Sequence, residues 1–415
     1  MSSTTSLQAA PSSALDIPET PDLERMRRET GARLRSAMAD RGVDALILLG
    51  NNSVVYATGA SWPLGDAGLS HVERPVAVAL ADDPHPHLFL PFREGAASES
   101  GLPADHLHGP VYLEFDEGVE NFARVLEDLI PAAAVIAVDE LTGAMRRAQD
   151  RLFRSGRPAD AAQIVGAAKL IKTPDELACM RTACRITDAA MVDVQAALAP
   201  GIRQIDLSAS FMRRAFELGA MASMLEPIWQ VMPKYKADGV WTTHGDLALP
   251  LLTTERELAA GDVLWTDVSI TYRGYCSDFG RTWVVGRDPT PRQQAQFHKW
   301  REILNAVLDV TRSGTTIAEL GRTATEANGG TRPWLPHFYL GHSIGVNAAE
   351  TPMIGTDLGD EFDKNFVLEP GMVMVLEPVV WEEGTGGYRS EEIVVITEEG
   401  WIPLTNYPYD PYGEP

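Results

Sequence analysis

The stretch DVSITYRGYCSDFGR, residues Asp267–Arg281, decides how the second half of this 415-residue chain folds. The apolar run before Asp267 predicts a strand that delivers a carboxylate. Arg273-Gly274-Tyr275 predicts a tight turn, and a second strand returns through Asp278 toward Val285. The two carboxylates therefore lie on paired strands, eleven residues apart (278 − 267). Because such acids repel each other and lose solvation near a core, the pattern indicates a positive partner between them, most simply a metal ion.

Three more candidate ligands lie downstream, each beside an apolar strand. His342 stands between Gly341 and Gly345, where the backbone can approach a site closely. Glu377 ends one apolar run and Glu391 precedes another, whereas the next residue, Glu392, should point to the opposite face of its strand. Four carboxylates and one imidazole suit two hard or borderline divalent cations that share bridging carboxylates. The candidate metal ligands are Asp267, Asp278, His342, Glu377 and Glu391.

The order of these residues carries a family resemblance. The phrases GYCSDFGRT, GHSIG, VLEP and YRSEEIVVITEEG resemble the pita-bread metalloenzymes, and most closely the branch of Xaa-Pro dipeptidase, aminopeptidase P and creatinase. The stretch RLRSAMADRGVDALILLGNNSVVYATG also resembles the amino-terminal domain of the creatinase and prolidase branch. The resemblance covers the chain from residue 23 onward, and it implies a metallohydrolase.

The resemblance also implies a role for each ligand. Asp267 would chelate one ion, Asp278 and Glu391 would bridge both ions, and His342 and Glu377 would complete the other. Glu377 would also serve as the general base, because it resembles the family glutamate that contacts metal and water. A metal-bridged hydroxide would then attack an amide carbonyl. The oxygen-rich ligand set favours manganese, iron(II) or cobalt over zinc.

Auxiliary residues are expected around the ligands. Arg281 and Arg389 would pair with ligand carboxylates and fix their orientation. In related peptidases a histidine in the region of His244 contacts substrate or donates a proton, and His244 is expected to do the same. Aromatic residues that flank the motifs, Tyr339 among them, would either line a substrate pocket or, as is more common, belong to the core.

Two positions depart from the related peptidases. These usually carry a second histidine seven residues after the metal-binding one, where this chain has Ala349 (342 + 7). They often carry another histidine four residues before it, where this chain has Phe338, although His337 next to it could substitute. Alanine and phenylalanine cannot shuttle protons as histidine does. The metal ligands are therefore complete, whereas the peptide-handling residues are not.

Three functions follow from these observations. The first is a dinuclear metallohydrolase of the Xaa-Pro dipeptidase and aminopeptidase P type, acting on a short peptide or a small amide. The second, favoured by Ala349 and Phe338, is a non-peptidase of the same fold that acts on a small molecule. It would break a carbon–sulfur bond, as dimethylsulfoniopropionate lyases do, or hydrolyse a small amidine, guanidine or cyclic amino-acid derivative. The third is an inactive binding module, which the five retained ligands disfavour.

Composition narrows the remaining possibilities. The chain is 45% hydrophobic and 22% charged, which is typical of a globular protein. Its net charge of −23 argues against nucleic acid or an anionic membrane as a partner, because both require a basic face. Cys179, Cys184 and Cys276 make no disulfide framework. No apolar run is long enough to span a membrane, and residues 1–22 resemble a flexible arm rather than a signal peptide. We expect a cytoplasmic protein and, by resemblance, a homodimer.

The pattern of elements predicts two domains after the arm. Alternating strands and helices over residues 23–164 predict an α/β amino-terminal domain. Residues 165–415 predict an α+β pita-bread domain, in which helices over 174–197, 204–218, 291–311 and 316–327 back a curved antiparallel sheet. Thr173 should cap the first of these helices, with Pro174 in its first turn.

Five of the nine histidines fall within the amino-terminal domain. The pairs His85-Pro86-His87 and His106-Leu107-His108 could suggest a metal site. Because no carboxylates accompany them at a fixed spacing, polar residues of loops or edge strands are the preferred interpretation. The five are His71, His85, His87, His106 and His108.

Overall fold

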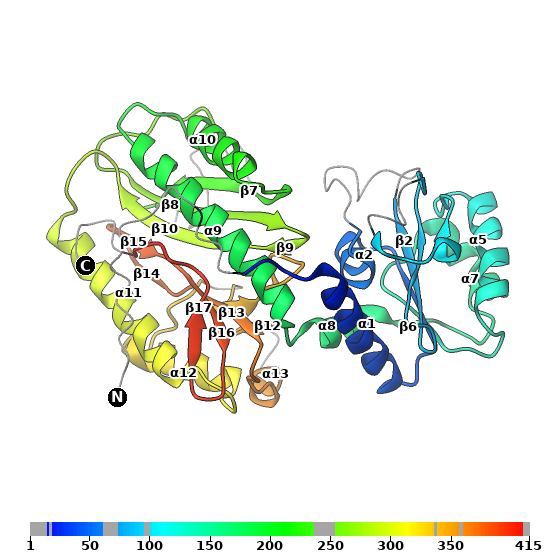
Figure 1. Cartoon of the computed structure of the whole chain (residues 1–415). Helices are drawn as coiled ribbons and strands as arrows, with labels where there is room; N and C mark the ends of the chain where they lie inside the picture. The colour runs from blue at the N-terminus through cyan, green and yellow to red at the C-terminus, as the bar shows by residue number, and fades with distance from the viewer. Residues whose placement is uncertain are drawn as a thin grey trace. The chain divides into compact units, whose positions relative to one another are not determined.

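The computed structural model of the protein describes residues 15, 19–60, 74–94, 100–235, 254–335, 338–356 and 360–409. The chain divides into two compact units (Figure 1). One unit comprises Pro21–Glu176, and the other comprises Met1–Thr20 together with Leu177–Pro415. None of the helices in the described part of the chain combines the length and the apolar character that crossing a membrane requires.

The unit Pro21–Glu176 is built on one six-stranded mixed sheet in the order β4-β3-β2-β1-β5-β6. The middle strands β2 and β1 are antiparallel, whereas β1 and β5, β5 and β6, and β3 and β4 pair in parallel. The α/β amino-terminal domain predicted from the sequence is therefore confirmed. The strands are β1 (Ala45–Leu48), β2 (Val76–Leu80), β3 (His87–Phe89), β4 (Leu107–His108), β5 (Ile136–Val138) and β6 (Ala159–Asp160).

Helices of this unit pack on the sheet through apolar faces. In α5 (Asp116–Leu129) the buried residues Val119, Phe122 and Leu126 recur at helical spacing, so they form one stripe. That stripe joins the strand residues in a single core, in which Phe89 of β3 meets Phe122 edge to face at 5.2 Å. The other helices are α1 (Leu23–Ala39), α2 (Asn51–Thr58), α6 (Gly143–Arg147), α7 (Gln149–Leu152) and α8 (Ala161–Lys169), with a short 3₁₀ turn η1 at Ala104–His106.

The helices predicted for the second half of the chain are present at their expected places. The first begins as predicted, since the Glu176 amide donates to Thr173 Oγ1 at 3.2 Å and the Thr173 amide donates to Glu176 Oε2 at 2.7 Å. The helices are α9 (Pro174–Ala197), α10 (Gln204–Glu217), α11 (Pro291–Val310), α12 (Ile317–Ala327) and α13 (Asp360–Asn365).

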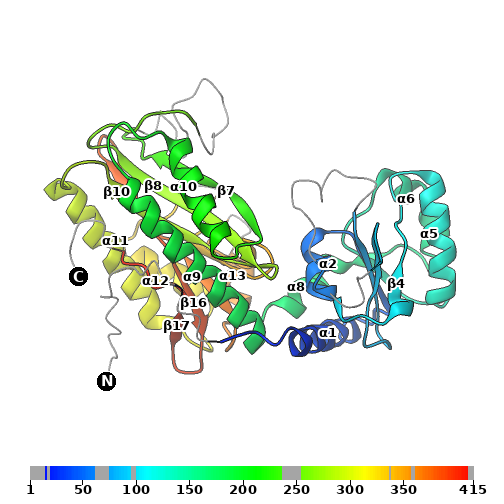
Figure 2. The same cartoon turned by 45° about the horizontal axis from the view of Figure 1, so that its top comes forward.

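Antiparallel sheets carry the rest of the larger unit. One has the order β10-β8-β7, with β9 also paired to β8, and α9 and α10 lie across it in both views (Figures 1 and 2). Phe211 of α10, Trp229 of β7 and Phe279 of β10 belong to the core between these layers. A second sheet has the order β12-β11-β13-β16-β17, and β14 and β15 form a separate ribbon. The strands are β7 (Ala222–Val231), β8 (Val263–Tyr272), β9 (Tyr275–Cys276), β10 (Phe279–Val284), β11 (Gly341–Ser343), β12 (Glu350–Ile354), β13 (Val373–Leu376), β14 (Val379–Glu382), β15 (Gly386–Arg389), β16 (Glu392–Ile396) and β17 (Trp401–Pro403).

The central hairpin turns where the sequence predicted. Tyr272 pairs with Tyr275, which leaves Arg273 and Gly274 as a two-residue loop. Both loop residues have positive φ, 52° and 84° respectively. Such a loop matches the right-handed twist of the strands that it joins, and it fixes the register of β8 against β9 and β10.

Candidate metal centre

The β8–β10 hairpin places two carboxylates on one face. Gly280 pairs with Asp267 and Phe279 pairs with Val268. Continuing this register sets Asp278 opposite Ser269, which shares a face with Asp267 because alternate strand residues point the same way. Asp267 and Asp278 therefore lie diagonally across the same face of the hairpin.

The glycine opposite Asp267 makes room for a third carboxylate. A Cβ atom at Gly280 would lie 2.6 Å from Glu391 Oε2, closer than any side chain tolerates. The carbonyl of Gly280 also accepts a hydrogen bond from the Glu391 amide at 3.2 Å. The missing side chain thus lets the glutamate reach the hairpin.

The second sheet delivers the other three candidate ligands to one face. His342 of β11 pairs with Val375 of β13, and Leu376 pairs with Glu392 of β16. The next facing positions are Glu377 and Glu391, just beyond the paired residues. By strand alternation both share a face with His342, whereas Glu392 points away. The Glu392 carboxylate accordingly accepts a hydrogen bond from Thr405 Oγ1 at 2.5 Å, on the opposite face of the strand.

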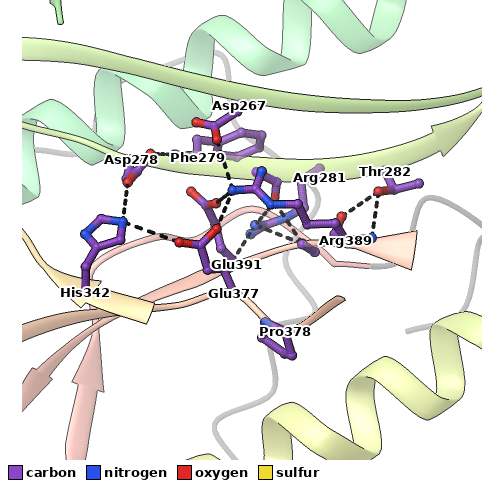
Figure 3. Close-up of polar contacts among 12 residues, drawn as sticks. Asp267, Asp278, Phe279, Arg281, Thr282, His342, Glu377, Pro378, Arg389 and Glu391 are labelled. Carbon is purple, nitrogen blue, oxygen red and sulfur yellow. Dashed lines mark hydrogen bonds and ion pairs between the residues drawn. The ribbon is translucent and has the colours of Figure 1, made fainter. Parts of the chain in front are cut away.

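The imidazole of His342 stands between two of these carboxylates (Figure 3). Its Nε2 atom lies 3.5 Å from Asp278 Oδ2 and 3.5 Å from Glu377 Oε1. Its Nδ1 atom lies 2.9 Å from the carbonyl oxygen of Ser343, to which it donates. The Nδ1 proton is therefore fixed by the backbone, and the lone pair of Nε2 faces the carboxylates, as a metal ligand requires.

Arg389 enters the cluster from β15. Its Nη2 atom lies 2.9 Å from Asp267 Oδ2, 2.5 Å from Glu377 Oε2 and 3.3 Å from Glu391 Oε2 (Figure 3). Burial lowers the pKa of Arg389, but the three carboxylates outweigh it and hold the pKa well above its ordinary value. Thr282 Oγ1 accepts the Arg389 amide at 3.2 Å, which fixes the backbone of the arginine. The expected contact of Arg389 with candidate ligand carboxylates is present.

Arg281 does not make the contact expected of it. Its side chain is 1% exposed and donates to backbone carbonyls, those of Gly280 at 2.8 Å and Glu391 at 2.7 Å among them, and to Ser390 Oγ at 3.3 Å. Its guanidinium also lies over the ring of Phe279 at 4.7 Å. Arg281 sits behind the cluster because β10 turns alternate side chains to opposite faces. It therefore holds the backbone of Glu391 rather than a carboxylate.

Each carboxylate of the cluster disfavours the ionised form of the others. Burial raises the pKa of Asp278 well above its usual range, and the nearby Glu391, Asp267 and Glu377 carboxylates raise it further. Burial also raises the pKa of Glu391 strongly and that of Glu377 to a lesser degree, while Arg389 lowers both. One guanidinium thus faces four carboxylates, and the remaining repulsion favours a bound cation.

The donor set fits metal ions. Asp267, Asp278 and Glu391 each present a carboxylate oxygen, and these atoms all lie within 4.8 Å of one another. Glu391 Oε1 is buried and has no hydrogen-bond partner among the described residues. A buried carboxylate oxygen without a partner loses its hydration, and a cation would restore that interaction. Oxygen donors joined by one imidazole suit hard or borderline divalent cations.

The auxiliary residues were less accessible to sequence reasoning. His244 and His337 lie outside the described residues. Ala349 is exposed, and its methyl group offers no donor, whereas Phe338 stacks on Tyr339 with ring centroids 4.2 Å apart. Tyr339 in turn meets the ring of His342 edge to face at 5.2 Å. The sequence marked this tyrosine only as a residue near a motif, and no spacing rule placed it against the histidine.

Both parts of the chain resemble known protein families. Residues 178–398 match the sequence profile of metallopeptidase family M24, and residues 32–171 match that of the creatinase/prolidase N-terminal domain. An uncharacterized peptidase of Bacillus subtilis, YqhT, is 26% identical over 386 residues, which span 91% of this chain and 97% of the relative. An Xaa-Pro dipeptidase of Pyrococcus furiosus is 28% identical over 246 residues, which span 57% of this chain and 63% of the relative.

A solved structure resembles the whole fold. The Xaa-Pro dipeptidase from Bacillus anthracis matches with a TM-score of 0.71 and 23% sequence identity, over 92% of this chain and 99% of that one. The match shows the same fold and supports the pita-bread architecture predicted from the sequence. Since the profile match covers more than half of the 415 residues, the chain belongs to metallopeptidase family M24.

Proposed function

We propose that the protein is a dinuclear metal-dependent peptidase that cleaves Xaa-Pro dipeptides or short Xaa-Pro peptides. The observation that carries the proposal is the convergence of four carboxylates and one imidazole on a single buried face, in a chain of metallopeptidase family M24. The name Xaa-Pro dipeptidase of the Pyrococcus furiosus relative supports the substrate class.

The five proposed ligands would hold two ions between them. Asp278 and Glu391 are proposed to bridge the ions, Asp267 to bind one, and His342 and Glu377 to bind the other. The set favours manganese, iron(II) or cobalt. Bound divalent ions would supply Lewis acidity, which polarises an amide carbonyl and lowers the pKa of water.

Side chains and backbone groups of the site would transfer a proton and position the ligands. Glu377 would accept the proton of the attacking water and pass it to the leaving amine. Arg389 contacts Glu377 Oε2, so it holds that carboxylate with Oε1 directed toward His342 Nε2. Gly280 and Arg281 keep the Glu391 backbone in place through its amide and its carbonyl.

A second candidate function rests on the edge of the site near Tyr339. Related peptidases usually carry a histidine where this chain has exposed Ala349 and often carry one where it has Phe338. The aromatic pair Phe338–Tyr339 stands at that edge instead, with Tyr339 against His342. An aromatic wall at this edge suits a small non-peptide substrate, cleaved at a carbon–sulfur bond or hydrolysed at an amidine, guanidine or cyclic amino-acid group.

Turnover assays decide between the two functions. Manganese-loaded protein is assayed against a panel of Xaa-Pro dipeptides and longer Xaa-Pro peptides, with a chelator control and with Asp278→Asn as the matched variant. Cleavage that the chelator and the variant both abolish supports the peptidase. Two bound metal ions without cleavage of any peptide would contradict it and favour the small-molecule enzyme.

A cytoplasmic homodimer is part of the same proposal, by resemblance to the creatinase and prolidase branch. Size-exclusion chromatography with light scattering measures the mass against the 45.2 kDa of one chain. Cell fractionation measures the location. A monomer at assay concentration, or recovery of the protein in a membrane or periplasmic fraction, would overturn that part.

A further inference from the structure

Four histidines gather at one edge of the six-stranded sheet in the unit Pro21–Glu176. They come from the pairs His85-Pro86-His87 and His106-Leu107-His108. Strands β3 and β4 run in parallel, with Leu88 beside Leu107 and Phe89 beside His108. Continuing that register sets His87 beside His106. Because alternate strand residues share a face, the His-x-His spacing gathers imidazoles on one side of the edge.

The rings are in direct contact. His87 and His106 stack in nearly parallel planes, with centroids 4.3 Å apart and an angle of 7°. His87 Nδ1 lies 3.0 Å from His108 Nε2, so one ring donates a hydrogen bond to the other. His87 is 6% exposed, whereas His106 and His108 are partly buried.

Two carboxylates complete the cluster. His106 Nε2 lies 3.1 Å from Asp83 Oδ2, and His106 Nδ1 lies 3.0 Å from Asp105 Oδ1. The other oxygen of Asp83 accepts the amide of His85 at 2.9 Å, which fixes the carboxylate at the edge. Sequence spacing does not indicate this partner, because Asp83 precedes His106 by 23 residues and only the fold brings the two side chains together.

Asp83, His87 and His106 each offer one donor atom within 4.8 Å of the other two. We propose that these three side chains bind a divalent transition-metal ion, zinc being the probe of choice, at a site whose ligands are distinct from those of the carboxylate cluster. Imidazole and carboxylate donors together suit zinc, copper(II) and nickel(II), whereas the carboxylate cluster suits harder ions.

The surroundings of the two imidazoles resemble those of metal ligands. Asp105 holds Nδ1 of His106, and His108 holds Nδ1 of His87, which leaves Nε2 of each ring for an ion. Such partners orient a ligating imidazole and raise its basicity.

The ligand geometry also sets the expected strength of binding. The separation of 3.1 Å between His106 Nε2 and Asp83 Oδ2 matches two donors that each lie about 2.1 Å from one ion. The planes of His87 and His106 are nearly parallel, however, so the Nε2 lone pairs of the two rings point along parallel lines. Both can reach one ion only if one of the rings tilts. His106 ends the short turn η1 and is partly exposed, so it is the ring that moves. Because this movement opens the stack with His87, we expect micromolar rather than nanomolar affinity for zinc.

Metal content of full-length variants tests the site. Metal-free protein is dialysed against low-micromolar free zinc, and bound zinc is measured by mass spectrometry. Wild type should hold one zinc per chain more than His106→Gln and than His87→Asn. When the same His106→Gln change is made in Asp278→Asn protein, whose carboxylate cluster is altered, it should still remove one zinc per chain, so failure of the proposed peptidase centre would not be mistaken for failure of this site. Asp105→Asn should weaken zinc affinity about tenfold, because it only orients His106.

Two controls keep the test decisive. His85→Gln removes an exposed imidazole of the same cluster and should bind zinc as wild type does. Circular dichroism without metal shows that each variant is folded. Equal zinc content in wild type and in folded His106→Gln and His87→Asn would overturn the proposal. So would an equal loss in His85→Gln, because that would indicate nonspecific binding to surface imidazoles.

Discussion

Two polar clusters of this chain differ in what their charges require. In the larger unit, four carboxylates share one buried face with Arg389, and burial, followed by their mutual repulsion, raises the pKa of Asp278, Glu377 and Glu391. In the unit Pro21–Glu176, imidazoles stack at a sheet edge and are already paired with Asp83 and with one another. The carboxylate cluster therefore carries more negative charge than Arg389 alone balances, whereas the imidazoles already have hydrogen-bond partners. A bound metal ion should therefore be essential to the carboxylate cluster and optional for the imidazole cluster.

The largest effect expected from this difference concerns turnover. Glu377→Ala should lower kcat/KM for an Xaa-Pro dipeptide by a factor of about 10³ or more, because it removes the proposed base and a ligand together. It should also impair binding of one ion. Glu382→Ala, in the neighbouring strand β14, is the matched control and should keep wild-type kcat/KM. Wild-type activity in Glu377→Ala would show that the proposed base is wrong.

A smaller loss of kcat/KM should follow from filling the space at Gly280, opposite Asp267. The methyl group of Gly280→Ala would lie 2.6 Å from Glu391 Oε2, so the carboxylate must move away from the hairpin. We expect kcat/KM to fall about 10²-fold, since a displacement of about 1 Å has that effect in active sites. Gly166→Ala, where nothing lies within 4 Å of the added methyl group, is the control and should not change activity. Unchanged kinetics in Gly280→Ala would mean that Glu391 need not contact the hairpin.

Metal-free stability should respond to charge at the carboxylate cluster. A carboxyl group whose folded pKa is raised binds its proton more tightly in the folded state, so stability falls as pH rises above about 4. Glu391→Gln removes one such group and should raise the midpoint of thermal unfolding of the chelator-treated protein at pH 7, by a few degrees. In manganese-loaded protein the same substitution should be destabilising, because it removes a proposed ligand. A lower midpoint in the metal-free variant would contradict the repulsion inferred for the cluster.

The smallest effect on stability should come from the imidazole cluster. Its dependence on pH should have the opposite sign to that of the carboxylate cluster. The pKa of His87 is lowered to about 4 by burial and by His106 and His108, so the unfolded chain binds a proton that folded His87 refuses. Stability should therefore fall as pH drops from about 6.5 to about 4. The raised pKa of His106, held by Asp105 and Asp83 against its burial, offsets part of this loss. In chelator-treated protein, His87→Gln should narrow the difference in unfolding midpoint between pH 7 and pH 5, whereas His85→Gln should leave it unchanged. If the difference in unfolding midpoint between pH 7 and pH 5 were equal in wild type and His87→Gln, His87 would not be the cause of a pH dependence opposite to that of the carboxylate cluster.

Local pattern determined much of this protein by itself. The turn at Arg273-Gly274 and the start of α9 at Thr173 follow from turn and capping chemistry, which needs only neighbouring residues. The alternation of strand faces by itself separates Glu391 from Glu392, whose carboxylate accepts from Thr405. Apolar runs beside the candidate ligands predicted the strands that carry them.

Tertiary structure decided which of these residues meet. Arg281 and Arg389 both follow candidate ligands in sequence, yet only Arg389 reaches the carboxylates, because β10 turns Arg281 toward the backbone behind them. The space at Gly280 matters only because the fold brings Glu391, the residue before β16, against the hairpin. Asp83 joins His87 and His106 through parallel pairing of β3 with β4, which no spacing in the sequence encodes. Periodicity fixes the face on which a side chain lies, whereas the pairing of distant strands fixes the neighbour that it finds there.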